Sequence, residues 1–186
     1  MKEKTRLLFD RLEARRGRII VRYSRLSAEQ LQFKPDPDQW NLLQVMRHLV
    51  TAEQQSVKLI RRNLVRHENF VRSGWGASTR HLILKIALRL PLKFKAPKIA
   101  EVKEESPDFE QMKSEWESVR NDLKEILTES DSSTLSKALY KHPRAGYLNI
   151  SQALEFMDEH IAHHQKQIER LVDQSKYLSD QNSQGI

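Results

Sequence analysis

Two histidines four residues apart, His160 and His164, are the side chains of this sequence best suited to chemistry. Residues at positions i and i+4 share one face of a helix, so both imidazoles can converge on one ion. His48, in a second apolar segment, can supply a third imidazole. Catalytic zinc sites commonly use three protein ligands and leave one position open. The pattern therefore predicts a site for a divalent metal, although a single inward histidine is more often a hydrogen-bonded core residue.

The spacing leaves one ligand undecided, because His163 lies three residues from His160. At 3.6 residues per turn, His163 and His164 point about 100° apart. The apolar stripe of the same segment favours His164 as the inward side chain, but spacing alone does not decide between the two. The pattern H-E-x-x-H is absent, which excludes a metalloprotease of that type.

Four long helices are expected to position these side chains. Apolar residues recur at steps of three and four over 4–23, 41–66, 106–128 and 149–177. His48 lies in the stripe of the second segment, and the histidine pair lies in that of the fourth. Five glycines and six prolines are too few for a fold rich in turns. We therefore predict an all-α four-helix bundle, a fold that builds metal sites from facing helices.

Capping residues mark several expected helix starts. Ser27 is suited to cap a short helical turn over 28–33. Ser106, followed by Pro107, is expected to cap the third long helix. Asn149 and Gln152 have the spacing of a capping box and are expected to open the fourth.

A single domain is expected over residues 1–178, with a disordered polar tail over 179–186. Residues 67–105 form a long insert between the second and third helices. Within it, 79–90 is predicted to be a basic amphipathic helix. We expect this segment to cover the bundle or form a dimer contact, rather than to lie on an anionic membrane.

The formal net charge of +7 is unevenly distributed. Residues 1–25 hold nine basic and three acidic side chains, whereas 101–186 hold ten basic and seventeen acidic ones. No basic motif interleaved with aromatic residues and no recognition-helix signature accompanies this asymmetry. We therefore expect solvated basic and acidic faces, and no nucleic-acid partner.

The sequence has no cysteine, which excludes disulfides, thiolate ligands and a cysteine nucleophile. Any thiol chemistry would need a thiol carried by a small molecule. The charged N-terminus lacks the apolar stretch of a secretory signal, and no window approaches a membrane span of about 20 apolar residues. The expected location is the cytoplasm, without a stable membrane anchor.

Two segments resemble the DinB-like superfamily. Residues 40–49, W-N-L-L-Q-V-M-R-H-L, resemble its W-S-x-x-E-V-L-x-H-L segment, with Asn41 and Gln44 in place of Ser and Glu. Residues 146–168 resemble its G-x-L, F, H-x-x-x-H-x-x-Q-I segment, and the likeness extends over about residues 5–175 in order and spacing. The resemblance implies an up-down-down-up bundle, often a homodimer. It implies one metal ion held by His48, His160 and His164.

Relatives in that family transfer a bacterial thiol cofactor onto electrophiles, and others are described as metal-dependent hydrolases. The resemblance implies one divalent ion per chain, with zinc and nickel as the expected metals. It implies a metal-dependent enzyme that activates a low-molecular-weight thiol, or water, towards a small substrate. No catalytic residue is assigned beyond the metal ligands. The alternative is a non-catalytic metal-binding or stress-response interaction protein whose site is structural or vestigial.

Other polar and aromatic residues near the histidines carry weaker expectations. Trp40 is expected to pack at the entrance of the second helix. Gln44 and Gln167 could each orient an imidazole, but a solvated position is favoured. Asp158 and Glu159 could assist as a base, but an exposed helix face is favoured.

Four further residues that could belong to a functional site lie in the expected loop and around the insert. His142 and Tyr147 precede the fourth helix in an expected loop and could line a pocket. His67 and His81 show no partner pattern and are expected at the surface.

Overall fold

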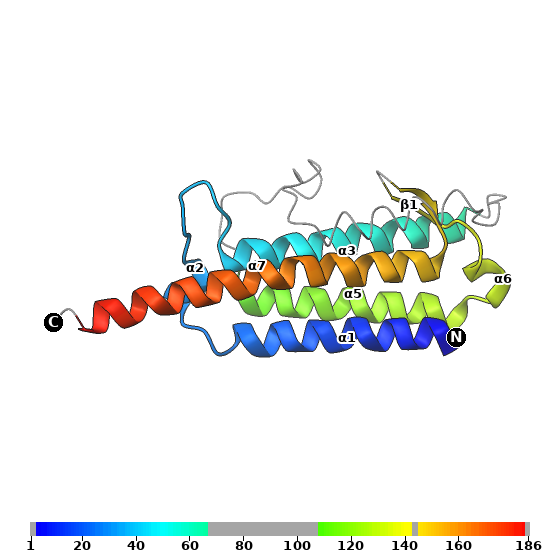
Figure 1. Ribbon diagram of the computed structural model, residues 1–186. Coiled ribbons are helices and arrows are strands. Elements are labelled where there is room, and N and C mark those ends of the chain that lie inside the picture. Colours follow the sequence, from blue (N-terminus) through cyan, green and yellow to red (C-terminus); the bar gives the residue numbers. More distant parts are fainter. Residues whose placement is uncertain (1–2, 67–107, 143–144, 185–186) are drawn as a thin grey trace.

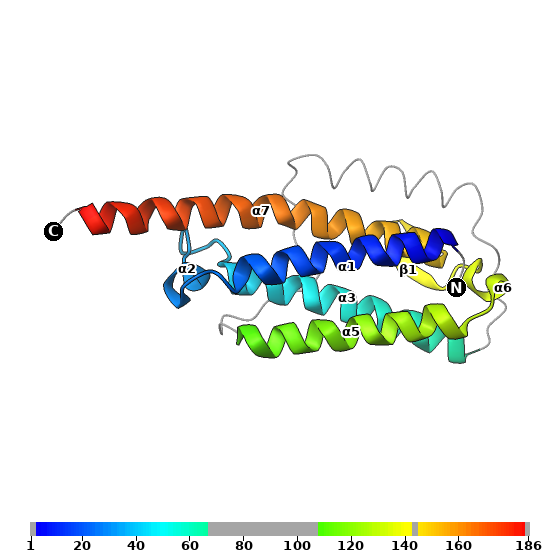
Figure 2. The same ribbon diagram turned by 90° about the horizontal axis from the view of Figure 1, so that it is seen from below.

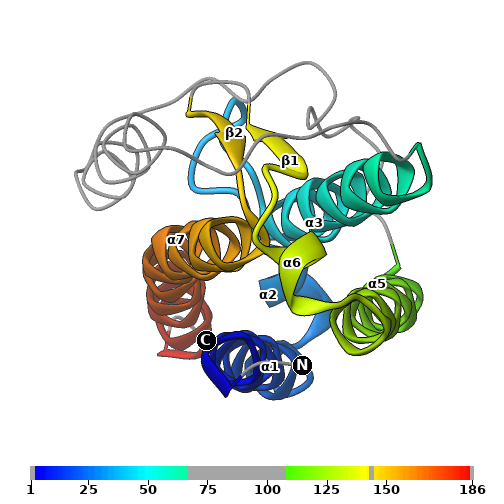
Figure 3. The same ribbon diagram turned by 90° about the vertical axis from the view of Figure 1, so that its right-hand side faces the viewer.

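Four long helices lie side by side in the computed structural model, which describes residues 3–66, 108–142 and 145–184 (Figure 1). They are α1 (Glu3–Tyr23), α3 (Leu42–Val65), α5 (Phe109–Glu129) and α7 (Ile150–Gln184). Seen end-on, α1 is flanked by α7 and α5, and α3 lies across from it (Figure 3). The colours in Figure 1 show that α1 and α7 run one way and that α3 and α5 run the other. The predicted all-α class is confirmed.

The smaller elements lie at the ends of the long helices. They are α2 (Ala28–Gln32), α6 (Ser132–Leu135) and an antiparallel pair of short strands, β1 (Tyr140–His142) and β2 (Gly146–Leu148). The sequence predicts a loop here, and the structure has a hairpin instead. Gly146 adopts a positive φ of 72°, a conformation that side chains with a Cβ disfavour.

Side-chain caps determine where the helices begin. Asn41 and Gln44 form a capping box at the start of α3, with side-chain to backbone distances of 2.8 and 3.1 Å. Asn149 and Gln152 form the same arrangement before α7, at 2.9 and 3.0 Å, which confirms the predicted start of that helix. Ser27 caps α2, also as predicted.

The predicted cap of the third long helix is wrong. Asp108, rather than Ser106, caps α5, because the Asp108 carboxylate accepts a hydrogen bond from the backbone N–H of Gln111 at 2.7 Å. A carboxylate at this position satisfies a free N–H group and also faces the positive end of the helix dipole. Ser106 and Pro107 themselves lie outside the described residues.

Apolar side chains from all four long helices fill the space between them. Leu12, Leu49, Leu123 and Ile161, one from each helix, are completely buried. Burial of each such side chain stabilises the fold by about 1.5–3 kcal/mol relative to its exposure. The buried Tyr23 hydroxyl donates a hydrogen bond to the backbone carbonyl of Leu42 at 2.8 Å, which ties the end of α1 to the start of α3.

Helix α7 continues to Gln184, past residue 178, where the ordered domain is predicted to end (Figure 2). The predicted disordered tail is therefore helical as far as Gln184. The reason is local: residues 151–184 contain neither glycine nor proline, so nothing in this polar segment stops the helix.

Several sequence predictions fall on segments that the structure does not describe. The insert over 67–105, its basic segment 79–90, His67 and His81 lie outside the described residues. Among the helices that are described, none has the length and apolar character needed to cross a bilayer. The cytoplasmic location stays a prediction.

Candidate metal site

Three imidazoles meet between α3 and α7. His48 comes from α3, and His160 and His164 come from successive turns of α7. One ring nitrogen from each lies within 4.8 Å of the others, and the two Nε2 atoms of His48 and His160 are 3.2 Å apart. The three ring centroids are separated by 4.8–5.1 Å. The sequence prediction that these three side chains converge agrees with the structure; that they bind a metal stays a prediction.

Of the two adjacent histidines on α7, His164 joins the group and His163 does not. The His163 ring stands at 89° to that of His164, with 5.1 Å between centroids. His164 is buried on the face of α7 that also buries Ile161 and Ile168, whereas His163 is half-buried. The apolar stripe therefore selects the inward histidine, as the sequence favoured.

Burial keeps two of the imidazoles uncharged. Removal of the His164 ring from water lowers its pKa to about 3, from the usual 6.5, and the neighbouring His48 adds to the effect. Burial also lowers the pKa of His160 well below its usual value, with further contributions from His164 and His48. Metals bind the neutral form of imidazole, so these rings need not lose a proton at neutral pH to act as ligands.

Gln167 fixes the orientation of the His164 ring. Its side-chain oxygen lies 2.9 Å from Nδ1 of His164. An amide oxygen only accepts hydrogen bonds, so this contact places the proton on Nδ1 and leaves the Nε2 lone pair free. The sequence favoured a solvated Gln167; the structure instead supports the alternative, that Gln167 orients an imidazole.

The arrangement fits a four-coordinate metal with little rearrangement. Metal–nitrogen bonds of 2.0–2.1 Å in a tetrahedron place neighbouring nitrogens about 3.3 Å apart. The 3.2 Å between the Nε2 atoms of His48 and His160 is close to that value. No two of the three nitrogens are more than 4.8 Å apart, so the His164 ring has to approach the other two by at most about 1.5 Å. Rotation of a side chain is sufficient for such a shift.

Aromatic side chains surround the three imidazoles. The Trp40 ring lies 5.2 Å from that of His48, which agrees with the predicted packing at the entrance of α3. Phe156 stacks on His160 at 5.7 Å, one turn earlier on α7. His142 of β1 packs edge-on against Phe156 at 4.4 Å. These rings limit the access of water to the imidazoles.

The hairpin that carries His142 is attached to α3. The Asn63 side chain donates to the backbone carbonyl of Leu139 at 2.8 Å, and the Ser56 hydroxyl donates to the hydroxyl of Tyr140 at 3.1 Å. His142 is buried, and its Nδ1 accepts from the backbone N–H of Ala145 at 3.0 Å. Of the two loop residues that could line a pocket, His142 therefore lies beside the site.

Tyr147 and Gln44 both lie away from the imidazoles, and the solvated position favoured for Gln44 is wrong. Tyr147 is 47% exposed, and the Lys141 ammonium group lies 5.4 Å from the centre of its ring. Gln44 is buried and serves the capping box of α3, rather than lying at a solvated surface.

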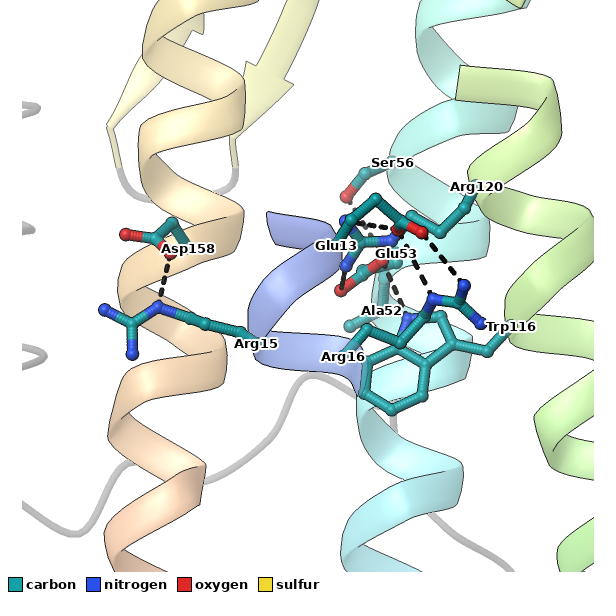
Figure 4. Close-up of polar contacts among 9 residues, drawn as sticks. All are labelled: Glu13, Arg15, Arg16, Ala52, Glu53, Ser56, Trp116, Arg120 and Asp158. Carbon is teal, nitrogen blue, oxygen red and sulfur yellow. Dashed lines mark hydrogen bonds and ion pairs between the residues drawn. The ribbon is translucent and has the colours of Figure 1, made fainter. Parts of the chain in front are cut away.

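The exposed position favoured for Asp158 is wrong. Its carboxylate is buried and pairs with Arg15 at 2.5 Å (Figure 4). It also pairs with Arg11 at 2.9 Å, and both arginines lie on α1. Asp158 precedes His160 by two residues, which is about 200° around the helix. It therefore faces α1, away from the imidazoles, and is not placed to act there as a base. Glu159 is half-buried.

A buried polar network on α3 and α5 was missed by the sequence reasoning (Figure 4). The Glu53 carboxylate accepts hydrogen bonds from Arg120 Nη2 at 2.7 Å and from Trp116 Nε1 at 3.0 Å. Glu13 of α1 lies 3.6 Å from Arg120 Nη1. The signal was present, because Glu53 follows Leu49 by four residues in an apolar stripe, where an acidic residue requires a buried partner.

Comparison with known proteins agrees with this architecture. The sequence matches the family model of the DinB superfamily over residues 11–168, a range that contains all three clustered imidazoles. No match was found among curated proteins or among solved structures. Because the matched range covers most of the 186 residues, the chain belongs to the DinB superfamily.

Proposed function

We propose that this protein binds one divalent metal ion through His48, His160 and His164, and that it is a metal-dependent enzyme. The observation that carries the proposal is the convergence of three buried or half-buried imidazoles on one point. Neutral imidazoles carry ring nitrogens that need polar partners in an apolar interior. An ion at this point would use those nitrogens as ligands.

The chemistry of such an ion is that of a Lewis acid, which lowers the pKa of a bound thiol or water. The residues of this chain prepare the site. Gln167 holds the proton of His164 on Nδ1, so that the Nε2 lone pair is available to a ligand. Trp40 and Phe156 pack against His48 and His160 and exclude water from one side of the cluster. Electrostatic interactions are stronger where water is excluded.

The composition and the ligand set support one class of substrate. The sequence has no cysteine, so a thiol reactant has to be a separate small molecule. Imidazole ligands are suited to zinc and nickel, among other transition metals. We propose a low-molecular-weight thiol as the activated reactant and a small electrophile as its acceptor, with water and hydrolysis as the second possibility.

Metal content tests the first step. Protein should be purified without a polyhistidine tag, which would add imidazoles, and analysed by mass spectrometry of the elements. We expect about one zinc or nickel per chain in the wild type and a loss in His164→Ala. His163→Ala is the matched control, since it changes the adjacent histidine outside the group, and it should retain the metal. A wild type that binds no metal, or equal loss in both variants, would contradict the proposal.

Cobalt substitution separates an enzyme site from a structural one. An open position predicts that the visible spectrum of the cobalt-loaded protein changes when a small thiol is added. That thiol should then be consumed in the presence of a model electrophile. A cobalt spectrum that no thiol changes, together with a lower melting temperature after chelation, would instead indicate a closed structural site.

A further inference from the structure

The carboxylate of Asp158, on α7, is held at both of its oxygens by arginines of α1. Asp158 is only 2% exposed. Its Oδ1 lies 2.5 Å from Nε of Arg15 (Figure 4). Its Oδ2 lies 2.9 Å from Nε of Arg11, which is four residues from Arg15 and on the same face of α1. Because both oxygens are engaged, the carboxylate is fixed in orientation as well as in position.

Arg15 contacts α7 at a second point, beyond the two histidines of the site. Its Nη1 lies 3.5 Å from the side-chain oxygen of Gln165. Asp158 and Gln165 are seven residues apart, so they lie about 20° from each other around the helix. One side chain of α1 therefore contacts α7 on both sides of the segment that carries His160 and His164.

These contacts lie on a different side of α7 from the imidazoles. At about 100° per residue, His160 and His164 lie about 160° and 120° around the helix from Asp158. A turn of α7 about its axis that draws the imidazoles away from His48 would also pull Asp158 away from the arginines. A turn of about 100° would bring His163 to the place of His164.

Stability alone does not account for a charged contact at this position. Replacing a buried ion pair with apolar side chains of similar volume is often neutral or stabilising. The buried apolar residues of α7 between 150 and 172 spread over about 100° of the helix circumference. Apolar contacts are not directional, so they fix the rotation of a helix less sharply than a carboxylate between two arginines does.

We propose that Arg15 and Asp158 are positioning residues of the metal site. Their ion pair fixes the rotation of α7 at which His160 and His164 face His48. The inference rests on the proposed metal site, but neither residue touches the ion. Asp158 acts through the helix backbone, which continues without a break past both histidines. Removal of groups that orient metal ligands typically lowers metal affinity about 10–100-fold.

Two substitutions that remove the pair test the proposal. Asp158→Leu replaces the carboxylate with an apolar group, and Arg15→Met keeps an unbranched stem without the cation. The side chains of Arg11 and Arg15 are 48% and 24% exposed, so they can turn to water when the carboxylate is lost. We expect both variants to remain folded, to bind cobalt about tenfold or more weakly, and to show a changed visible spectrum. The double variant should lose no more affinity than Asp158→Leu alone, because both changes act on one contact.

The rotation of α7 can also be measured without metal. The ring centroids of His160 and His164 lie 5.1 and 4.8 Å from that of His48, so nuclear Overhauser effects should join their ring protons in chelator-treated wild type. We expect these effects to weaken in both single variants. A wild type that shows them but binds no cobalt would contradict the proposed function, and the ring contacts of the variants would still decide the positioning role.

Arg22→Met is the matched control. Arg22 joins α1 to Asp173 of α7 at 3.8 Å, beyond the histidines and between two exposed side chains. The substitution makes the same change in net charge as Arg15→Met, and it should leave the ring contacts and the cobalt affinity unchanged. Urea denaturation in chelator measures how well each variant keeps its fold. Three results would overturn the proposal: unchanged ring contacts in both variants, an equal loss of affinity in Arg22→Met, or losses of affinity that only follow a loss of folded protein.

Discussion

Acidification should destabilise the metal-free protein through the imidazoles of the site. His164 has a pKa of about 3 in the folded protein, and an unperturbed histidine in the unfolded chain titrates near 6.5. Between these values the unfolded chain binds a proton that the folded protein does not. Stability is therefore fully present above pH 6.5 and is lost as the pH falls towards 3.

The magnitude follows from the same two values. Each pH unit within that window costs about 1.4 kcal/mol per histidine, so lowering the pH from 7 to 5 costs about 2 kcal/mol for His164. Burial shifts the pKa of His160 in the same direction, so His160 adds to this loss. This is a large part of the 5–15 kcal/mol that typically stabilises a domain.

Urea denaturation followed by circular dichroism at several pH values measures this dependence, in the presence of chelator. In His164→Gln the loss between pH 7 and 5 should be smaller by about 2 kcal/mol, because no titratable group remains at that position. His163→Gln, one residue away and outside the group, provides the comparison. An equal pH dependence in the wild type and His164→Gln would refute the conclusion that burial holds this imidazole neutral.

The remaining predictions concern the groups around the site. Arg120→Met should destabilise the protein by about 3–5 kcal/mol in urea denaturation, because it leaves the Glu53 carboxylate buried without its cation. Adding Glu53→Gln, which retains an acceptor for the Trp116 N–H, should recover much of that loss. Gln167→Leu should weaken metal affinity about 10–100-fold in a chelator competition without unfolding the protein. Asn41→Ala should lower the stability by about 1 kcal/mol, since it removes the cap of α3.

The helices were predictable because their signals are local. Asn149 and Gln152 satisfy the free N–H groups of one helix turn, so the box that starts α7 can be read from four consecutive residues. Asp108 shows the limit of this reasoning. Ser106 and Asp108 are both suitable capping residues, and only the backbone conformation determines which of them caps α5. The hairpin was missed because strands of three residues have too few positions to show an alternation.

The buried charges were not predictable from residue type. Glu53, Arg120 and Asp158 belong to types that are almost never fully buried unless paired. Their partners lie on other helices, more than 60 residues away for the Glu53–Arg120 pair and 143 for the Arg15–Asp158 pair. A periodicity along one helix contains no information about such contacts. The same limit applies to the imidazoles: the stripes could assign each one inward, but the choice of His48, His160 and His164 as one set came from the resemblance to a known family.

The contacts on the two faces of α7 limit which movements could bring the three imidazoles to the distances that an ion requires. Asp158 anchors the helix to α1 through two arginines, while His160 and His164 face α3 from the opposite side. The capping box at Asn149 fixes the start of the helix as well. A movement of the whole helix would disturb all of these contacts, whereas rotation about a histidine side chain leaves the contacts of Asp158 and Asn149 intact. The approach of about 1.5 Å that a tetrahedral ion needs therefore belongs to the imidazoles themselves, and the backbone already holds them in position.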